Sequence, residues 1–539
     1  MSEVERTSAT ASPALPGDVE KATGNSSRAA GISSMRRHVD NNDPDDALKL
    51  VTGEAVVLTP EDEKKLLRKI DRNMMPLLCI VYGLNYLDKT TLSYASVMGI
   101  RTDLHLIGQD YSWIASIFYF GYLFWEWPTN RLLQRLPLAK YSAFNVIMWG
   151  LTLCCMAAVK NFGGAMAVRF FLGAFEAAVS PGFALFTSQW YTKKEQGTRV
   201  GWWFSFNGWA QIIGGCVAYG IAVGTESHPI LIKSWQLLFL VTGFFTAFMG
   251  GLFLYLMPDS QLNARFLTPQ ERVMAVERIR INQQGVGNKH FKWYQCKEAL
   301  TDPMIWAFVL YSVISSIPNG GVSNYFSQLI VSFGFSENAS LLLGAPGGAV
   351  QIITLLICGH FGDRFKNRIV RPPSPYNVPK VDSCFQLFGA AGVLLAALGL
   401  FLILLLPISN SGGRLAGYYL YQSSSTGFVA LLGLISTNVA GWTKKTTAAA
   451  MYLIAYCVGN IIGPQVFQST DAPQYRNANI TILVCMCVAF AILIFINAWC
   501  RHQNKAKAVV RASPGYTRVD GQEFLDLTDR ENPEFIYTL

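Results

Sequence analysis

The chain has 539 residues, of which 51% are apolar and only 15% carry a charge. Soluble domains carry about 25% charged residues, so the composition excludes a set of ordinary soluble domains. The net charge of +9 does not indicate nucleic-acid binding, because the basic residues are placed as loop charges of a membrane protein. The eleven cysteines lack zinc or redox spacing, and we interpret them as small hydrophobic residues.

Both ends of the chain are polar. Residues 1–72 are rich in Ser, Asp, Asn, Gly and Ala and lack the apolar core of a signal peptide. We therefore predict a disordered cytosolic tail over 1–72. Residues 501–539 form a second polar segment, which we also predict to be a cytosolic tail.

Twelve apolar segments lie between these tails. About 20 apolar residues in a helix cross a ~30 Å hydrocarbon core, so each segment is a predicted membrane span. A polar central loop, 258–302, separates a bundle of six helices over 73–257 from a second bundle of six over 303–500. The sequence thus predicts an all-α membrane protein with the outline of a two-fold-repeated transporter. The predicted spans lie near 74–98, 112–135, 141–160, 163–187, 198–222, 235–257, 303–330, 338–361, 382–407, 415–437, 446–468 and 478–500.

The loop charges predict the orientation. With the N-terminus inside, the inner loops hold twenty Lys and Arg residues and the outer loops hold five. Cytoplasmic loops of membrane proteins are enriched in these residues. We therefore expect both termini in the cytosol.

Four ionisable side chains stand out inside the predicted spans: Asp88 and Lys89 in the first, and Arg169 and Glu176 in the fourth. Such groups are costly in a bilayer and suggest function. With a rise of ~1.5 Å per residue, Asp88 lies ~21 Å above the inner face and Arg169 ~9 Å below the outer face. In a ~30 Å core these levels coincide, so an Asp88–Arg169 ion pair is possible. Glu176 lies ~10 Å deeper on the same helix face as Arg169.

Carboxylates at two depths beside a buried arginine suggest a proton relay. The remaining cation, Lys89 or Arg169, would then bind an anionic substrate. An alternative for a single basic residue is that its side chain extends to the membrane surface. Two acid–base pairs at matching depths are poorly explained in that way.

Other polar residues are weaker candidates. Glu126, between Trp125 and Trp127, could lie near the inner membrane interface. Polar side chains in the second half could bind the polar groups of a substrate, although for each one singly a hydrogen bond between packed helices is the better interpretation. These are Asn319, Asn324, Tyr325, Gln328, Gln351, Tyr452, Tyr456 and Asn460.

Motifs for other kinds of chemistry were not found. The sequence has no phosphate-binding loop of an ATP-driven pump, no histidine-based metal motif and no convincing nucleophile elbow. We therefore expect no enzymatic activity, no cofactor and no metal site. Secondary transport is the class that remains.

Three motifs resemble the anion:cation symporter family of the major facilitator superfamily, and most closely its fungal allantoate permease branch. The first is Asn85-Tyr86-Leu87-Asp88-Lys89, and the second is Arg169-Phe170-Phe171-Leu172-Gly173-Ala174-Phe175-Glu176 followed by Pro181-Gly182. The third is a pair of inner loops, Pro128 to Lys140 and Gly359 to Arg368, of which the second is close to the superfamily's gating loop. The resemblance covers roughly residues 70–500.

The resemblance implies roles for particular residues. Asp88 and Glu176 would take part in proton coupling, and Lys89 and Arg169 in anion binding and charge pairing. Arg131, Asp363 and Arg364 would belong to gating loops. Asn130 stands where the superfamily's first loop usually has an acid, which puts a charged latch there in doubt. We include as candidate substrate-binding residues Asn85, Tyr86, Asn324, Tyr325, Gln328, Tyr452, Tyr456 and Asn460.

These observations lead to one expected function and two alternatives. We expect a monomeric, proton-coupled importer of a small organic anion such as allantoate, nicotinate or pantothenate, located in the plasma membrane. Its partners would be the anion, the proton and the bilayer, with no nucleic acid. The alternatives are an exporter of a secondary metabolite and a nutrient sensor that binds without transporting.

Overall fold

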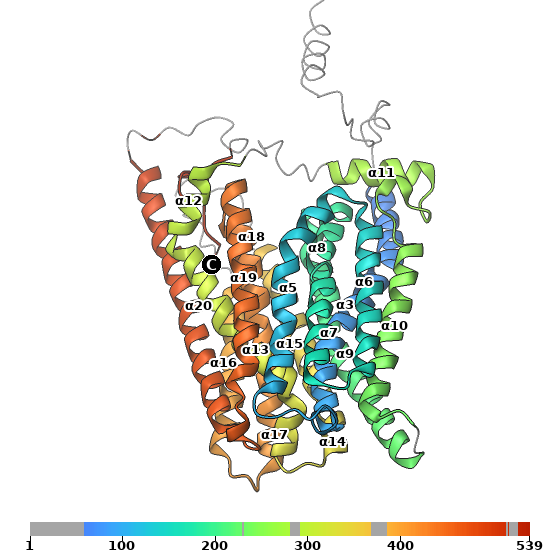
Figure 1. Ribbon diagram of the computed structural model, residues 1–539. Coiled ribbons are helices and arrows are strands. Elements are labelled where there is room, and N and C mark those ends of the chain that lie inside the picture. The colour runs from blue at the N-terminus through green and yellow to red at the C-terminus, as the bar shows by residue number, and fades with distance from the viewer. Residues whose placement is uncertain are drawn as a thin grey trace, which may run out of the picture. The chain divides into compact units, whose positions relative to one another are not determined.

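The computed structural model describes residues 59–228, 231–280, 291–367, 385–513, 516 and 526–538. Most of the predicted N-terminal tail, 1–58, lies outside this range. Within the described residues all regular elements are α-helices or short 3-10 helices (Figure 1). The first half contains α3 Pro60–Val97, α4 Ile100–Asp103, α5 Asp110–Arg135, α6 Leu138–Cys155, α7 Phe162–Glu176, α8 Val179–Trp190, α9 Lys193–Ser227 and α10 Ser234–Leu256. The central loop contains α11 Pro269–Arg280 and α12 Trp293–Thr301. The second half contains α13 Pro303–Ser332, α14 Glu337–Leu343, α15 Ala345–Asn367, α16 Phe385–Leu405, α17 Ser411–Tyr421, α18 Ser425–Asn438, α19 Trp442–Val466 and α20 Arg476–Arg511.

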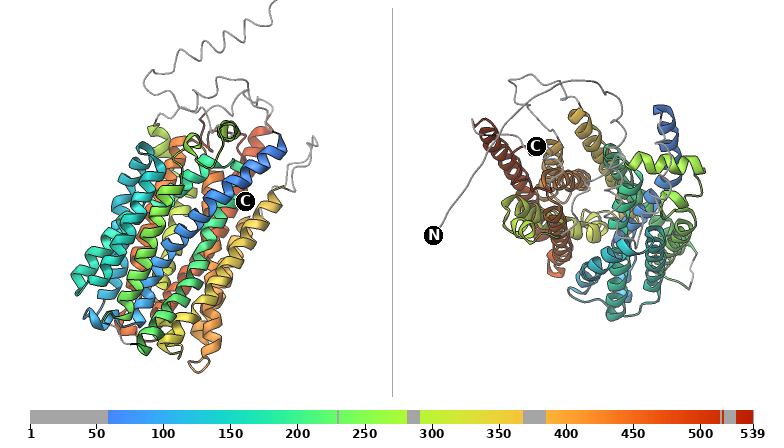
Figure 2. Two further views of the ribbon diagram at one scale, coloured as in Figure 1. Left: turned by 90° about the vertical axis from the view of Figure 1, so that its right-hand side faces the viewer. Right: turned by 90° about the horizontal axis from the view of Figure 1, so that it is seen from above.

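Each predicted span coincides with one helix or with two consecutive helices. Eight helical segments of the described residues are long and apolar enough to cross a membrane. Seen along the helix axes, the helices of the first and second halves gather on opposite sides of the bundle (Figure 2, right). The predicted all-α membrane fold is confirmed.

Several helices extend beyond the predicted spans. α3 begins at Pro60, so residues 60–72, expected in the N-terminal tail, are helical. Thr59 caps this helix by accepting a hydrogen bond from the Asp62 amide. Pro60 lies in the first turn, where a backbone N–H would have no acceptor within the helix, so the missing N–H of proline costs nothing. At the other end of the chain, α20 continues to Arg511, well into the predicted C-terminal tail.

The fourth span is broken directly after Glu176. α7 ends at Glu176, and α8 resumes at Val179. Pro181 lacks an amide hydrogen and cannot donate to the carbonyl of Ala177 four residues earlier, which favours a break at this point. The break places Glu176 at a helix terminus in the interior of the bundle.

The two halves are joined by hydrogen bonds near one end of the bundle. We call the end that carries α11 and α12 the central-loop end, and the opposite end, near α14 and α17, the far end (Figure 1). Toward the far end, Ser93 of α3 bonds Ser327 of α13 at 3.2 Å, and Ser116 of α5 donates to the Ile461 carbonyl of α19 at 2.7 Å. The Gln211 amide of α9 donates to the Gly344 carbonyl at 3.0 Å.

The central-loop helices are each attached to a different half. In the first half, Lys69 of α3 bonds Glu271 of α11 at 2.7 Å, and Arg278 of α11 pairs with Glu195 of α9. α12 packs against the second half instead, where Gln295 accepts a hydrogen bond from the Thr443 amide at 3.1 Å. The central loop is therefore anchored at two points, one on each half.

Residues 526–538, which we call the C-terminal strap, pack against the central-loop end of the second half. Asp526 pairs with Lys292 at 2.8 Å, and this hydrogen bond raises the pKa of the Lys292 ammonium group. At its other end, the strap exchanges two hydrogen bonds with Asn438, one to the Thr538 carbonyl and one from the Thr538 amide. The sequence alone suggested only a polar tail here.

A buried charge cluster holds the strap. The Lys444 side chain is fully buried and lies 2.7 Å from Asp529 of the strap, 2.8 Å from Asp302 and 2.9 Å from Glu298. Asp529 is itself fully buried and accepts a hydrogen bond from the Tyr537 hydroxyl at 2.8 Å. Opposite charges that share a buried site offset the cost of removing each from water.

We predict that Asp529→Ala lowers the free energy of unfolding by about 1–3 kcal/mol, because a buried charge pair is broken while Lys444 keeps two other carboxylates. The loss would be measured as a lower Tm of the purified protein in detergent. Lys65→Ala is the matched control, since Lys65 is exposed and its pair with Asp62 is long, at 4.0 Å. Equal Tm values for both variants would contradict a stabilising strap.

Candidate functional site

The four charged residues predicted in the spans lie together in the first half. Asp88 of α3 is 3.7 Å from Nη1 of Arg169 of α7, and both side chains are almost fully buried. The indole Nε1 of Trp149, from α6, donates a hydrogen bond of 3.0 Å to the second oxygen of Asp88. The expected Asp88–Arg169 pair is thus present, although its functional role stays a prediction.

A second pair lies beside the first. Lys89 Nζ is 2.8 Å from Glu176 Oε1, and the Asn85 amide donates to the same oxygen at 2.7 Å. Lys89 also donates to Asn85 Oδ1 at 3.0 Å. Asn85 lies one helical turn before Lys89 on α3, so both reach Glu176 where α7 ends. We call these five side chains the charge network: Asn85, Asp88, Lys89, Arg169 and Glu176.

Close packing of α5 against α7 places an aromatic ring against this network. A Cβ on Gly173 of α7 would lie 1.9 Å from the Phe118 carbonyl oxygen, and one on Gly121 of α5 would lie 2.0 Å from the Phe170 carbonyl oxygen. Only glycine allows these backbones to approach so closely. As a result, the Phe118 ring lies 5.3 Å from the Arg169 guanidinium and 5.9 Å from the Lys89 ammonium, at cation–π distance.

The network is balanced in charge but incompletely hydrogen-bonded. It contains two cations and two carboxylates, so it is neutral when all four are ionised. Arg169 Nε and Nη1 and Glu176 Oε2 are buried and have no hydrogen-bond partner among the described residues. Unused donors on a buried guanidinium are the chemistry that an incoming carboxylate requires.

A polar pocket lies between the two halves and shares α3 with the charge network. Its cavity volume is about 20 Å³, which holds about one water molecule. The amides of Gln211 and Gln351 are buried, and their Oε1 atoms have no hydrogen-bond partner within the described part of the chain. Such oxygens can accept N–H or O–H donors from a ligand. The lining includes Tyr86, Gln211, Asn319, Gln351, Tyr418 and Gln422.

Three of the candidate substrate-binding residues lie instead in the contact between the halves near the far end. The Tyr325 ring stacks on Phe467 at 4.5 Å, and its hydroxyl is 2.6 Å from Ser112. Gln328 accepts hydrogen bonds from Arg101 at 3.2 Å and from Tyr475 at 2.9 Å. The backbone carbonyl of Asn324 accepts from Tyr111 at 2.7 Å. Four aromatic rings of this contact pack on one another, and we call them the aromatic seal: Tyr111, Tyr325, Phe467 and Tyr475.

The remaining candidates are more dispersed. Tyr456 lies 6.1 Å from Tyr119 across the two halves, and Tyr452 packs 5.8 Å from Phe428. Asn460 accepts from Asn319 at 2.9 Å and stabilises the packing of α19 on α13. Among the predicted gating residues, Arg131 is exposed near the end of α5. Asp363 and Arg364 lie in α15, but their side chains are outside the described part.

Two residues that contact the charge network, Trp149 and Phe118, were not predicted from the sequence. Both look like ordinary apolar residues of a span, and only the fold brings them to the charges. A weak signal existed for Trp149, because an indole N–H inside a membrane span needs a hydrogen-bond acceptor. No comparable signal exists for Phe118, whose position depends on the close approach of α5 and α7.

We predict that Arg169→Gln destabilises the protein by about 3–5 kcal/mol, because it leaves the buried Asp88 carboxylate without its cation. The double variant Asp88→Asn/Arg169→Gln should recover part of this loss, since it removes the uncompensated charge. Tm values of the two variants in detergent measure the difference. A double variant that is less stable than Arg169→Gln would contradict a direct charge pair.

Comparisons with known proteins agree with this architecture. Residues 78–464 match the model of the Major Facilitator Superfamily. The chain is 38% identical over 504 residues to the allantoate permease of Saccharomyces cerevisiae, covering 92% of this chain and 90% of the permease. It is 40% identical over 486 residues to an uncharacterized transporter of Schizosaccharomyces pombe, covering 89% and 91% of the two chains.

A solved structure shares the fold at low sequence identity. A bacterial homolog of the human lysosomal transporter Spinster aligns with a TM-score of 0.56 and 16% identity, covering 82% of this chain and 98% of that one. The family match over residues 78–464 and the observed helical bundle lead to the same conclusion. The chain belongs to the Major Facilitator Superfamily and is a multi-pass membrane transporter.

Proposed function

We propose that this protein is a proton-coupled importer of a small organic anion, with the charge network as the site where proton and anion meet. The observation that carries the proposal is the pairing of Lys89 with Glu176 beside the Asp88–Arg169 pair, all inside the bundle. Burying an ionisable group inside a membrane bundle costs free energy, and the groups that are found there usually serve binding or proton transfer.

Charge balance links the two substrates. When a proton binds Glu176, that carboxylate becomes neutral and Lys89 loses its counter-charge. The network then carries one net positive charge, which one carboxylate group of a substrate can compensate. A proton and a monovalent anion together restore neutrality, whereas either one alone leaves a buried net charge. The proposal therefore includes a stoichiometry of one proton per monovalent anion.

The polar pocket supports a substrate that also carries neutral polar groups. Its lining offers amides and hydroxyls but no cation, and Tyr86 lies one helical turn from Lys89 on α3. The pocket would widen before the neutral part of a carboxylate bound by Lys89 and Arg169 reaches Gln211 and Gln351. The similarity to the allantoate permease supports small anions of this type as the first to test.

We further propose a plasma-membrane location with the central-loop end in the cytosol. The excess of Lys and Arg in the loops at this end supports this orientation. The anion and the proton would then enter from the far end, where the aromatic seal lies, and leave at the central-loop end. We propose that the transporter acts as a monomer.

We expect yeast that lacks its own anion transporters to accumulate one labelled anion when it expresses this chain. The panel is allantoate, nicotinate, pantothenate, a dipeptide and a sugar acid. Uptake should be stronger at pH 5 than at pH 7, because the inward proton gradient is larger, and a protonophore should abolish accumulation. Cells expressing Glu176→Gln and cells with empty vector are the controls. No uptake of any anion by protein shown to be at the cell surface would contradict import and favour export or sensing.

Glu176→Gln should abolish proton-driven accumulation but preserve exchange of labelled for unlabelled substrate. Glutamine retains the hydrogen-bonding shape of the side chain but cannot take up and release a proton. Net uptake against a gradient and counterflow exchange in proteoliposomes measure the two activities separately.

Glu337→Gln is the matched control for this change, because Glu337 is an exposed carboxylate on α14, outside the charge network. It should leave both activities unchanged. Accumulation by Glu176→Gln at the wild-type level would remove Glu176 from the coupling mechanism.

A further inference from the structure

Glu126 is a buried carboxylate that the charge network does not use. Its side chain lies on α5 and is only 7% exposed. The sequence suggested only a level near the inner membrane interface, which stays a prediction. One oxygen accepts a hydrogen bond from Asn130 at 2.9 Å. The other oxygen, Oε2, is buried without a hydrogen-bond partner, and the described residues provide no ion pair for it.

The helical spacing places Glu126 on the face of α5 that packs against α19. Ser116, Tyr119, Leu123 and Glu126 follow one another at intervals of three or four residues and therefore share a face. On this face, Ser116 donates to the Ile461 carbonyl, and Tyr119 lies 6.1 Å from Tyr456. Both partners belong to α19. We call this contact, which joins the first half to the second, the α5–α19 seam.

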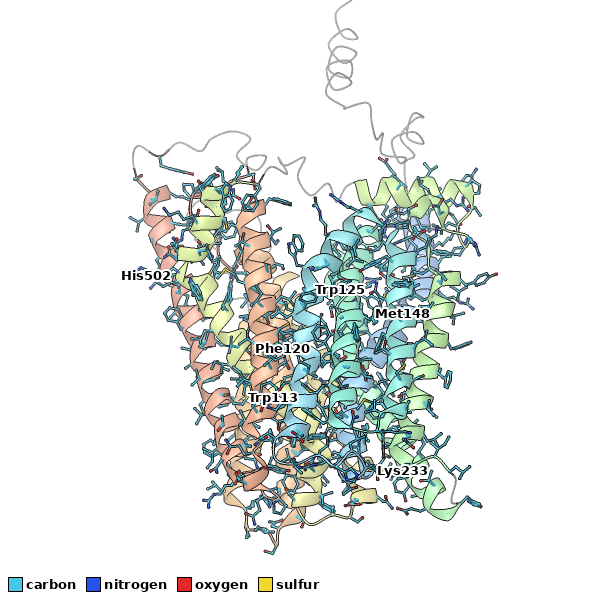
Figure 3. The ribbon with its side chains drawn as sticks, viewed as in Figure 1. Trp113, Phe120, Trp125, Met148, Lys233 and His502 are labelled. Atoms are coloured by element: carbon cyan, nitrogen blue, oxygen red, sulfur yellow. The ribbon has the colours of Figure 1, made fainter. Side chains whose placement is uncertain are left out.

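Glu126 lies toward the central-loop end of this seam. It is eight residues beyond Phe118, or ~12 Å along the helix axis. In Figure 3, Trp125, its immediate neighbour, lies nearer than Phe120 to the end that carries α11 and α12. Glu126 is thus well separated along α5 from the ring that contacts Lys89 and Arg169.

The titratable groups around Glu126 supply no positive charge. On its own helix the nearest is Tyr122, and α19 contributes Cys457 and Tyr456. On α7, Glu176 is already paired with Lys89 at 2.8 Å, and α6 contributes Tyr141, which bonds Thr129 of α5 at 2.8 Å. Arg131, five residues further along α5, is exposed and forms no ion pair with Glu126 in the described part of the chain. Among the described residues a bound proton is therefore the available means of neutralising Glu126 while the seam is closed.

A purely structural role accounts poorly for this side chain. A buried carboxylate that stabilises a fold is normally paired with a cation or accepts several hydrogen bonds. Glu126 has one side-chain donor and would cost less as an apolar residue of similar size. Its position at the junction of two halves that rock past one another suggests instead a group whose surroundings change during transport.

We propose that Glu126 is a second proton-binding residue, which stays neutral while the α5–α19 seam is closed and releases its proton toward the central-loop end when the seam opens to water. This inference rests on the proposed proton coupling and adds the site from which the proton leaves. The step is a proton transfer: the carboxyl O–H bond breaks, the proton passes to water and the carboxylate is left behind.

The test is the dependence of transport on pH at the central-loop side. Proteoliposomes would be sorted for one orientation, and the probe would be the first of allantoate, nicotinate and pantothenate that the wild-type protein accumulates. Acidifying the compartment at the central-loop side should slow net uptake by wild type several-fold, because proton release is opposed. Glu126→Gln should lose this dependence and keep counterflow exchange, and Glu126→Asp should restore the dependence. Glu337→Gln is the control that should behave as wild type.

A measurement on the wild-type protein guards against a variant that fails to fold. Dicyclohexylcarbodiimide modifies carboxyl groups that are protonated in apolar surroundings, and peptide mass spectrometry locates the adduct. We expect modification of Glu126 in the wild-type protein at neutral pH and none at the exposed Glu337. An unmodified Glu126, or a Glu126→Gln variant with the wild-type pH dependence at the central-loop side, overturns the inference.

These outcomes separate this inference from the proposed function. If wild-type protein accumulates no anion in response to a proton gradient, the proposed coupling fails, whatever the labelling of Glu126. If wild-type accumulation is proton-driven and Glu126→Gln behaves as wild type, the coupling stands and only the role of Glu126 is lost.

Discussion

The structure of the first half depends on balancing buried charge inside a bundle of apolar helices. Two cations and two carboxylates lie within reach of one another on α3 and α7, where any one of them alone would be strongly unfavourable. This requirement fixes which faces of the two helices point inward. It also explains the neighbours: Trp149 donates to Asp88, Phe118 covers both cations, and the glycines of α5 and α7 allow the ring to approach.

The contacts between the halves suit a bundle that hinges. In the described residues, polar contacts between the halves are concentrated toward the far end, in the aromatic seal and in bonds such as Ser93–Ser327. The central-loop end is organised differently. There α11 is bound to the first half, whereas α12 and the C-terminal strap are bound to the second half through Lys292 and the buried Lys444. Each half therefore carries its own polar structure at this end, and the halves can move relative to each other without breaking it.

The two groups of acids differ in how their charge is compensated. Asp88 and Glu176 have cationic partners. In the mechanism that we propose, proton binding there would change the pairing of Lys89 and Arg169 and make a cation available to an anion. Glu126 has no cation among the described residues, and its neighbour across the seam is α19 of the other half. A proton at the first site would thus be coupled to substrate, and a proton at the second to the contact between the halves.

The membrane class, the approximate positions of the helices and the charged residues of the first and fourth spans could all be read from the sequence. These follow from short-range properties: an apolar run of sufficient length must be a helix in a bilayer, and a charge within it stands out. It also predicted that Asp88 and Arg169 share a level, because rise per residue is constant. Four other features emerge from the three-dimensional structure alone. Lys89 pairs with Glu176, Gln328 belongs to the far-end contact, Glu126 is buried, and residues 526–538 fold back onto Lys444. These depend on which helix faces meet and how closely, and helix contacts are set by small residues and packing between segments far apart in the chain, for which periodicity within one segment carries no information.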